Sequence, residues 1–130
     1  ILNFKLKKID TYIKKRRILA NIYDKELKNT SLKIPSRSKE LFDVFHLYTV
    51  YHPKREKIIN KLHLKGIQTR IIYPYPIHLM KGYKTYFKNK RFQEAEIKSK
   101  RIFSLPLYPE LKKNLVYKIC KELKKILNNV

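Results

Sequence analysis

Histidine is the side chain that most often carries a proton or binds a metal near neutral pH, and this chain has four of them. His46, His52, His63 and His78 show no HxxxH spacing supported by a carboxylate, so the sequence predicts no metal site. His78 differs from the others because it follows segment 73–76, whose sequence is YPYP. Two prolines stiffen the backbone before this histidine, and the pattern therefore predicts a functional role for it.

The other reactive residue types do not form a catalytic set. Ser99 and Ser104 lack the sharp turn that exposes a serine nucleophile. Glu94 and Glu96 are two residues apart on an expected helix, so their carboxylates point in different directions. Cys120 falls within an apolar helical stripe, which favours a buried structural thiol over a nucleophile. We therefore expect no catalytic residue within these 130 residues.

Composition limits the class of protein. The chain has 32 Lys and Arg against 10 Asp and Glu, and 43% of its residues are hydrophobic, which is enough for one domain with a core. Two glycines exclude a glycine-rich nucleotide loop, and a single cysteine excludes a disulfide framework. No apolar run is long enough to cross a bilayer, and no signal-peptide pattern is present. These features predict a cytoplasmic protein without a membrane partner.

The net charge of +22 has two interpretations. A strong positive field attracts polyanions, and basic residues alternate with aromatic ones between Lys81 and Arg91, as in surfaces that bind phosphates and stack bases. Lysine, isoleucine, asparagine and tyrosine also share AT-rich codons, so a biased genome produces the same balance without an anionic partner. The lysines are spread along the chain rather than gathered in one block, which favours the second interpretation.

Apolar periodicity predicts a helix at each end of the chain. Residues 1–28 carry apolar side chains at three- and four-residue spacings, and so do residues 111–127. The first helix begins without Met and without a capping residue, so we expect the sequence to start inside a longer protein. The apolar stripe of this helix comprises Leu2, Leu6, Ile9, Ile13, Ala20, Tyr23 and Leu27. A stripe of this length requires a partner surface.

Residues 41–130 are predicted to form an α/β portion. Residues 43–51 are rich in β-branched and aromatic side chains, which predicts a strand with His46 and Tyr48 on one face. Pro53 then suits the start of a helix and Gly66 its end. The remaining predicted elements are strands over 67–73 and 102–105 and a helix over 92–100. This order predicts an α/β (α+β) fold, a short sheet flanked by helices with a long N-terminal helix.

Several short motifs follow one another in a specific order. They are His46-Leu47-Tyr48, Arg55-Glu56, Gly66-Ile67, YPxPxH from Tyr73 to His78, Tyr83 and Ser104-Leu105-Pro106. Together they resemble the DegT/DnrJ/StrS-type sugar aminotransferases, and the resemblance covers residues 1–130. It extends to the C-terminal third of a family member only. It therefore implies the small C-terminal domain of the aspartate-aminotransferase architecture, PLP fold type I.

The resemblance implies a function for the whole enzyme. Family members use pyridoxal phosphate (PLP) to move an amino group from an amino acid, such as glutamate, to a nucleotide-linked keto-sugar for surface polysaccharide, and they act as homodimers. The Schiff-base lysine and the PLP-binding groups lie in the family's large N-terminal domain, which has no counterpart in this sequence. We therefore expect PLP in the full-length enzyme, and neither PLP binding nor catalysis by residues 1–130 alone.

The resemblance also implies roles for individual residues. Tyr73 and His78 are expected to contact the nucleotide-sugar substrate, and His46 and Tyr48 to support the site from behind. The family often has a histidine directly before the Tyr-Pro pair, where this chain has Ile72, so the group contacting the sugar differs. The alternative function, from a different class, is a basic nucleic-acid-binding module without enzymatic activity.

Overall fold

The computed structural model describes residues 2–38, 40–88 and 90–130, so the first residue of the helix predicted over 1–28, Ile1, lies outside the described residues. The elements in chain order are α1 (Leu2–Leu6), α2 (Ile9–Leu27), β1 (Tyr48–Tyr51), α3 (Arg55–Leu64), the 3-10 helix η1 (Ile77–Leu79), α4 (Gln93–Ser99), β2 (Ile102–Leu105) and α5 (Lys113–Asn128). β1 and β2 form an antiparallel pair in which Tyr48 lies opposite Leu105 and Tyr51 opposite Ile102.

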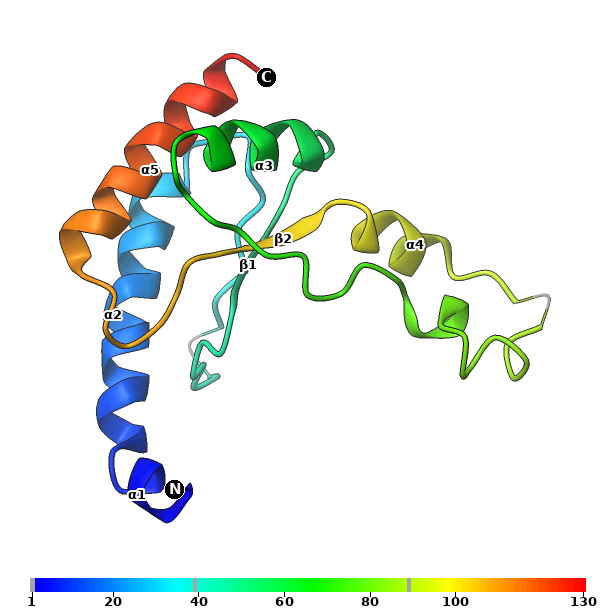
Figure 1. The fold of residues 1–130 in the computed structure, drawn as a ribbon, viewed down its shortest axis with the longest axis horizontal. Helices are drawn as coiled ribbons and strands as arrows, with labels where there is room; N and C mark the ends of the chain where they lie inside the picture. The colour runs from blue at the N-terminus through cyan, green and yellow to red at the C-terminus, as the bar shows by residue number, and fades with distance from the viewer. Residues whose placement is uncertain (1, 39, 89) are drawn as a thin grey trace.

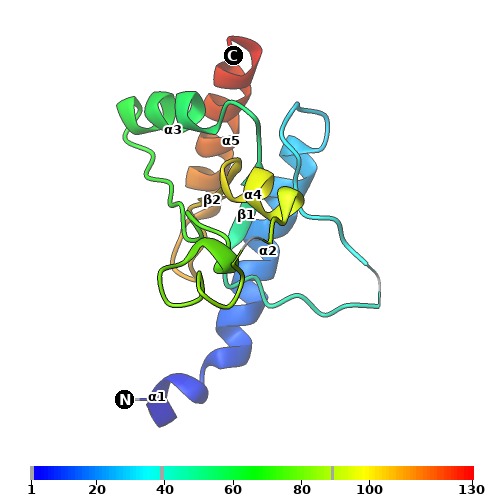
Figure 2. The same cartoon turned by 90° about the vertical axis from the view of Figure 1, so that its right-hand side faces the viewer.

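The molecule has two parts, a body and an arm. In the body, α2, α5 and α3 lie around the two-stranded sheet (Figure 1). The arm, which we define as residues 72–99, carries η1 and α4 and projects away from the body (Figure 1). A view from the side places η1 and α4 together at the end of the molecule that faces the viewer (Figure 2).

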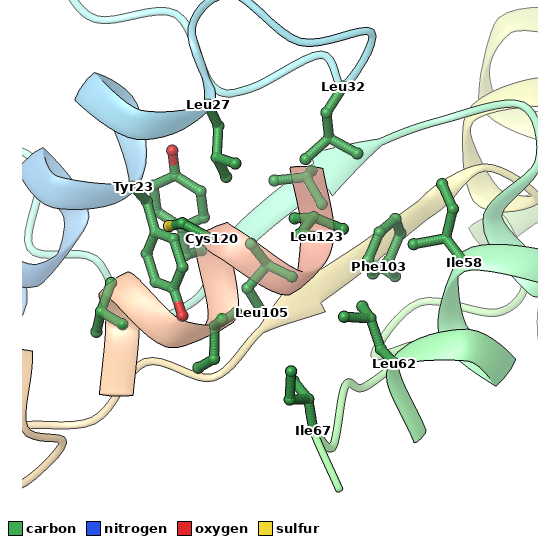
Figure 3. Close-up of a cluster of buried hydrophobic side chains, with 14 of the residues drawn as sticks. Tyr23, Leu27, Leu32, Ile58, Leu62, Ile67, Phe103, Leu105, Cys120 and Leu123 are labelled. Carbon is green, nitrogen blue, oxygen red and sulfur yellow. The ribbon is translucent and has the colours of Figure 1, made fainter. Parts of the chain in front are cut away.

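The core lies between the sheet and the helices. Side chains from α2, α5, α3 and both strands meet in one apolar cluster, part of which is drawn in Figure 3. The rings of Tyr23 on α2 and Tyr48 on β1 lie 4.7 Å apart within it. All of the fully buried hydrophobic residues in the described chain precede residue 68 or follow residue 102, so the arm contributes none of them.

Helix α5 follows its sequence pattern closely. Its buried residues are Val116, Ile119, Cys120, Leu123 and Ile126. These positions repeat every three or four residues and so form one face of a helix, and the prediction of a buried structural Cys120 is confirmed. Leu115, predicted on the same face, is 42% exposed because it lies at the edge of the buried stripe.

The N-terminal helical stripe is only partly buried. Leu19, Ala20, Tyr23 and Leu27 are buried, whereas Leu2, Leu6 and Ile9 are exposed. The helix is interrupted between Leu6 and Ile9, and its first part extends beyond the sheet and α5, where none of the described elements covers it (Figure 1). The prediction of one continuous helix is therefore wrong, and the apolar periodicity continues past the end of the core.

Two predicted strands are shorter in the structure. The strand expected over 43–51 contains only Tyr48–Tyr51, because Phe45 adopts a φ of +50°, which interrupts the extended backbone. The strand expected over 67–73 is reduced to a single bridge between Arg70 and Ser104. Pro74 and Pro76 follow shortly after this bridge, and a proline cannot donate a ladder hydrogen bond. The strand predicted over 102–105 is confirmed.

Gly66 ends α3 in the left-handed conformation that its sequence position predicts. Its φ is +72°, and its N–H donates to the carbonyl of His63 at 2.8 Å. A Cβ built on Gly66 meets nothing within 4 Å, so a substitution acts only through the backbone. We expect Gly66→Ala to lower the free energy of unfolding by about 1 kcal/mol in urea titrations.

Gly82 offers a matched control for this substitution. A Cβ at Gly82 also meets nothing within 4 Å, and its φ is not positive. Gly82→Ala is therefore expected to leave the unfolding midpoint unchanged or to raise it slightly. Equal losses for the two variants would contradict the conformational explanation.

Candidate functional site

Tyr48 is the centre of a polar network between β1 and α2. Its hydroxyl donates a hydrogen bond to Asp24 Oδ1 at 2.7 Å, and the other carboxylate oxygen of Asp24 pairs with Arg37 at 2.5 Å. Arg37 also reaches the Asp43 carboxylate at 3.7 Å. Burial, followed by the bond to Asp24, raises the pKa of Tyr48, so its hydroxyl stays protonated and continues to donate. This network fixes the segment before β1 against α2.

His46 lies in that segment and not in the strand. Its side chain is exposed and β1 begins only at Tyr48, so the prediction that His46 shares one face of a strand with Tyr48 is wrong. The left-handed Phe45 immediately before it turns the chain away from the extended path that the sequence pattern assumed. Any role of His46 in supporting a site from behind stays a prediction.

Tyr73 lies at the start of the arm with its side chain available to a ligand. It is 56% exposed, and large apolar neighbours in the same segment are exposed as well. Three residues earlier, the backbone of Arg70 forms two hydrogen bonds with that of Ser104. The N–H of Arg70 donates to the Ser104 carbonyl at 3.1 Å, and the N–H of Ser104 donates to the Arg70 carbonyl at 2.8 Å. Tyr73 therefore follows a fixed point of the backbone and points away from the body's core.

His78 forms the centre of a small core inside the arm. The residue is only 5% exposed, and its Nε2 lies 3.2 Å from Glu96 Oε1 on α4. Its ring packs 4.9 Å from that of Phe92 and 6.5 Å from that of Phe87, measured between centroids. An ionised carboxylate can only accept, so Nε2 carries the proton in this pair. His78 thus joins η1 to α4.

Glu96 is a residue of the site region that sequence reasoning missed. Besides Nε2 of His78, its Oε1 accepts a hydrogen bond from the Phe92 backbone N–H at 3.3 Å, and Arg91 lies 3.7 Å from Oε2. The bond from His78 lowers the pKa of Glu96, burial opposes it, and Phe92 and Arg91 lower it further. The only sequence signal was a carboxylate on a predicted helix, and its partner lies 18 residues away in the chain.

The depressed pKa of Glu96 makes the arm sensitive to acid. A carboxylate whose folded pKa lies below its ordinary value of 4.5 stabilises the fold above that value and loses this contribution as the pH falls through the folded pKa. We expect the arm's amide protons to lose protection from exchange below about pH 4.5, before those of α5 do. Hydrogen exchange followed by NMR from pH 3 to 6 measures this, and Glu96→Gln is expected to remove the dependence.

Two attachments hold the arm on the body. One is the backbone pair between Arg70 and Ser104, and the other is Arg55 on α3. The Arg55 guanidinium donates to the carbonyl of Ser99 at 2.7 Å and to that of Ile102 at 3.2 Å. These carbonyls belong to the last residue of α4 and the first residue of β2, so Arg55 fixes the point at which the arm returns to the sheet.

The four residues predicted for the site occupy three places. Tyr48 lies in the body's core, His46 is exposed before β1, and Tyr73 and His78 lie on the arm. Within the described ranges, no hydrogen bond, ion pair or ring contact joins any two of them. The arm also presents exposed aromatic and basic side chains together, namely Tyr73, Tyr75, Tyr83, Tyr86, Lys81, Lys84, Lys88 and Arg91.

In the described part of the chain, no group of three or more His, Cys, Asp and Glu residues is arranged to hold a metal ion. Over the same residues, no helix is both long and apolar enough to cross a membrane.

The comparisons with known proteins identify relatives along the whole chain. Residues 1–124 match the model of the DegT/DnrJ/EryC1/StrS aminotransferase family. A pleiotropic regulatory protein from Geobacillus stearothermophilus is 34% identical over 116 residues, which cover 86% of this chain and 31% of that protein. A dTDP-3-amino-3,4,6-trideoxy-alpha-D-glucose transaminase from Micromonospora megalomicea subsp. nigra is 30% identical over 136 residues, which cover 100% of this chain and 36% of that enzyme.

Solved structures of the same family superpose on this chain. A DegT DnrJ EryC1 StrS aminotransferase from Brucella abortus superposes with a TM-score of 0.89 at 26% identity, over 98% of this chain and 34% of that one. S. venezuelae DesV has the same TM-score of 0.89 at 23% identity, over 99% of this chain and 35% of that one, which shows the shared fold. The predicted fold class is confirmed, and these relatives give no support to the nucleic-acid alternative.

This chain spans about a third of the length of the curated relatives that it matches. The family match nevertheless extends from residue 1 to residue 124, through both the body and the arm. The resemblance inferred from the sequence is confirmed: the chain belongs to the DegT/DnrJ/EryC1/StrS aminotransferase family.

Proposed function

We propose that residues 1–130 form the substrate-facing small domain, the C-terminal third, of a PLP-dependent nucleotide-sugar aminotransferase. The whole enzyme transfers an amino group from an amino acid to a keto-sugar carried on a nucleotide. The family match over residues 1–124 carries this proposal. Relatives named as transaminases of dTDP-linked amino sugars, from Micromonospora megalomicea and Aneurinibacillus thermoaerophilus, support the substrate class. We further propose that the enzyme is a cytoplasmic homodimer that serves polysaccharide biosynthesis.

The described residues do not fit a PLP site of their own. A Schiff-base lysine must be held and desolvated, and PLP also requires an acidic partner for its ring nitrogen. No lysine in the described ranges is buried. We therefore assign the cofactor and the reactive lysine to the part of a full-length family member that these 130 residues do not match, and we propose that this chain alone is inactive.

In this proposal the arm meets the substrate. Tyr73 offers an exposed ring and hydroxyl, which suits a sugar hydroxyl or a ring face. At His78, Nε2 is engaged by Glu96, which leaves Nδ1 as the ring atom for a polar contact with a substrate hydroxyl. Tyr48 supports the site indirectly, through its hydrogen bond to Asp24, which also pairs with Arg37. His46 supports the site from the segment before β1, which this polar network holds against α2.

A chimeric enzyme tests the proposal. Residues 1–130 replace the matched segment of the Micromonospora megalomicea transaminase, and kcat/KM is measured with its nucleotide sugar. We expect an active chimera, in which Tyr73→Ala lowers kcat/KM at least about tenfold. The matched control is Tyr86→Ala, at a tyrosine of the same arm that is 80% exposed, with an expected change below about twofold. A folded, PLP-loaded chimera without activity would contradict the proposal, and so would equal losses at the two tyrosines.

The isolated chain tests where the reactive lysine lies. PLP is added, borohydride fixes any lysine adduct, and mass spectrometry locates it. We expect weak labelling scattered over the exposed lysines, as their similar exposure predicts. Stoichiometric labelling of one lysine would overturn the assignment of the cofactor to another part of the enzyme.

A further inference from the structure

His52 is a buried histidine that lies outside the arm and outside the contacts proposed for the substrate. It is 7% exposed and follows β1 directly, before the start of α3. Its Nδ1 lies 3.1 Å from the backbone nitrogen of Lys54, which can only donate a hydrogen bond, so Nδ1 carries no proton. The proton of the neutral ring is therefore on Nε2, 3.4 Å from the hydroxyl oxygen of Ser31. The contact with Lys54 requires the neutral ring, because a protonated ring carries a hydrogen on Nδ1 as well.

The surroundings of His52 oppose a positive charge on its ring. The charged side chains on the segments around it are Lys54, Arg55 and Glu56 at the start of α3, Lys33 and Arg101 beside Tyr51, and Lys25, Glu26, Lys28 and Lys124, which line a surface cleft with Ser31. The two acids among them are engaged in ion pairs of 2.6 Å with Arg55 and Lys124. Burial, and then the charge of Lys54, lower the pKa of His52 below its ordinary value of 6.5. The positive end of the α3 dipole also disfavours a cation at this place.

His52 lies at the point where the arm returns to the body. Its backbone N–H donates to the carbonyl of Arg101 at 3.0 Å, and this carbonyl lies in the chain between the two that accept from the Arg55 guanidinium. Arg55 is the first residue of α3, and Lys54, whose N–H the His52 ring accepts, directly precedes it. The ring therefore fixes the backbone from which Arg55 reaches the arm.

We propose that His52 is a pH-sensitive latch for the arm: the neutral ring holds the start of α3 and thereby the grip of Arg55 on the arm, and protonation of the ring weakens both. A group whose pKa is lowered by folding stabilises the fold fully above its ordinary value, here 6.5, and loses this contribution as the pH falls through the folded pKa. The latch therefore weakens between about pH 7 and pH 5, above the range in which Glu96 acts. It concerns the attachment of the arm and holds whichever ligand the arm binds.

The nitrogen chemical shifts of the imidazole test the contact with Lys54. At pH 7.5 we expect the His52 ring to carry its proton on Nε2 and none on Nδ1. On titration to pH 5 we expect its midpoint to lie below 6.5. A proton on Nδ1 at pH 7.5, or a midpoint at or above 6.5, would overturn the proposal.

Amide exchange in α4 tests the link from the ring to the arm. Between pH 7.5 and pH 5, and after correction for the intrinsic pH dependence of exchange, we expect α4 to exchange about fivefold faster at the lower pH, the equivalent of one lost hydrogen bond. Unchanged exchange in α4 would show that the ring does not control the arm. Arg55→Gln removes the proposed link itself, so its α4 should exchange faster at both pH values, with no further acceleration in acid.

His52→Asn separates this histidine from the other titratable groups. An asparagine side-chain oxygen accepts from the backbone N–H two residues ahead, so the variant keeps an acceptor for Lys54 and does not titrate. We expect its α4 exchange to be equal at pH 7.5 and pH 5. The matched control is His63→Asn, at an exposed histidine near the end of α3, which should keep the fivefold acceleration. Acceleration that persists in His52→Asn would assign the effect to another group and end the proposal.

Discussion

Replacing Tyr48 with alanine is expected to lower the free energy of unfolding by about 3–5 kcal/mol. The ring is fully buried and packs 4.7 Å from Tyr23, so its removal leaves a cavity between β1 and α2. The same change removes the donor to Asp24 and leaves its carboxylate with the ion pair to Arg37. Urea denaturation followed by circular dichroism measures the loss, which is a large share of the stability of a domain of this size.

Tyr48→Phe divides this effect into its two causes. The phenylalanine ring preserves the packing and removes only the hydroxyl, so the expected loss is about 1–2 kcal/mol. Tyr117→Ala removes an exposed ring from α5 and is expected to cost less than about 0.5 kcal/mol. If Tyr48→Phe costs as much as Tyr48→Ala, the polar network rather than the packing holds β1 against α2.

Replacing His78 with alanine is expected to open the arm and leave the body folded. The variant loses the hydrogen bond to Glu96 and the ring contacts with Phe92 and Phe87, which together stabilise the arm by about 2–4 kcal/mol. Amide exchange in α4 should accelerate about a hundredfold, while the amides of α5 keep their protection. Hydrogen exchange followed by mass spectrometry resolves the two regions.

His63 supplies the matched control for this prediction. It is an exposed histidine near the end of α3, and His63→Ala is expected to leave exchange in the arm unchanged. Loss of protection in both α4 and α5 in the His78 variant would contradict the independence of arm and body. An unchanged arm would show that the aromatic side chains hold it together without the histidine.

Sequence patterns predicted the elements that are governed by neighbouring residues. The three- and four-residue spacing of α5, the turn at Gly66 and the extent of β2 all depend on interactions within a few positions, and the structure confirms them. Hydrophobic periodicity also predicted the buried half of α2. It gave no information on where the core ends: Leu2 and Leu6 belong to the same apolar stripe, and both are exposed.

The candidate site depended on contacts that spacing does not encode. His78 and Glu96 are separated by 18 residues, and Tyr48 and Asp24 by 24. No local pattern brings such partners together, because the path of the chain through the whole fold decides their distance. The left-handed conformation of Phe45 could not be predicted either, because Phe45 lies in a segment whose residue types favour a strand. Tertiary packing overrode that local preference.

The arm leaves and rejoins the body at neighbouring points, beside Ser104 and beside Ser99, and supplies no side chain to the fully buried core. Insertions, deletions and substitutions between those points therefore cost the scaffold little stability. The stability of the body and the sequence of the arm are therefore separable, so the arm can change in length and side chains while the buried interior of the body stays as it is.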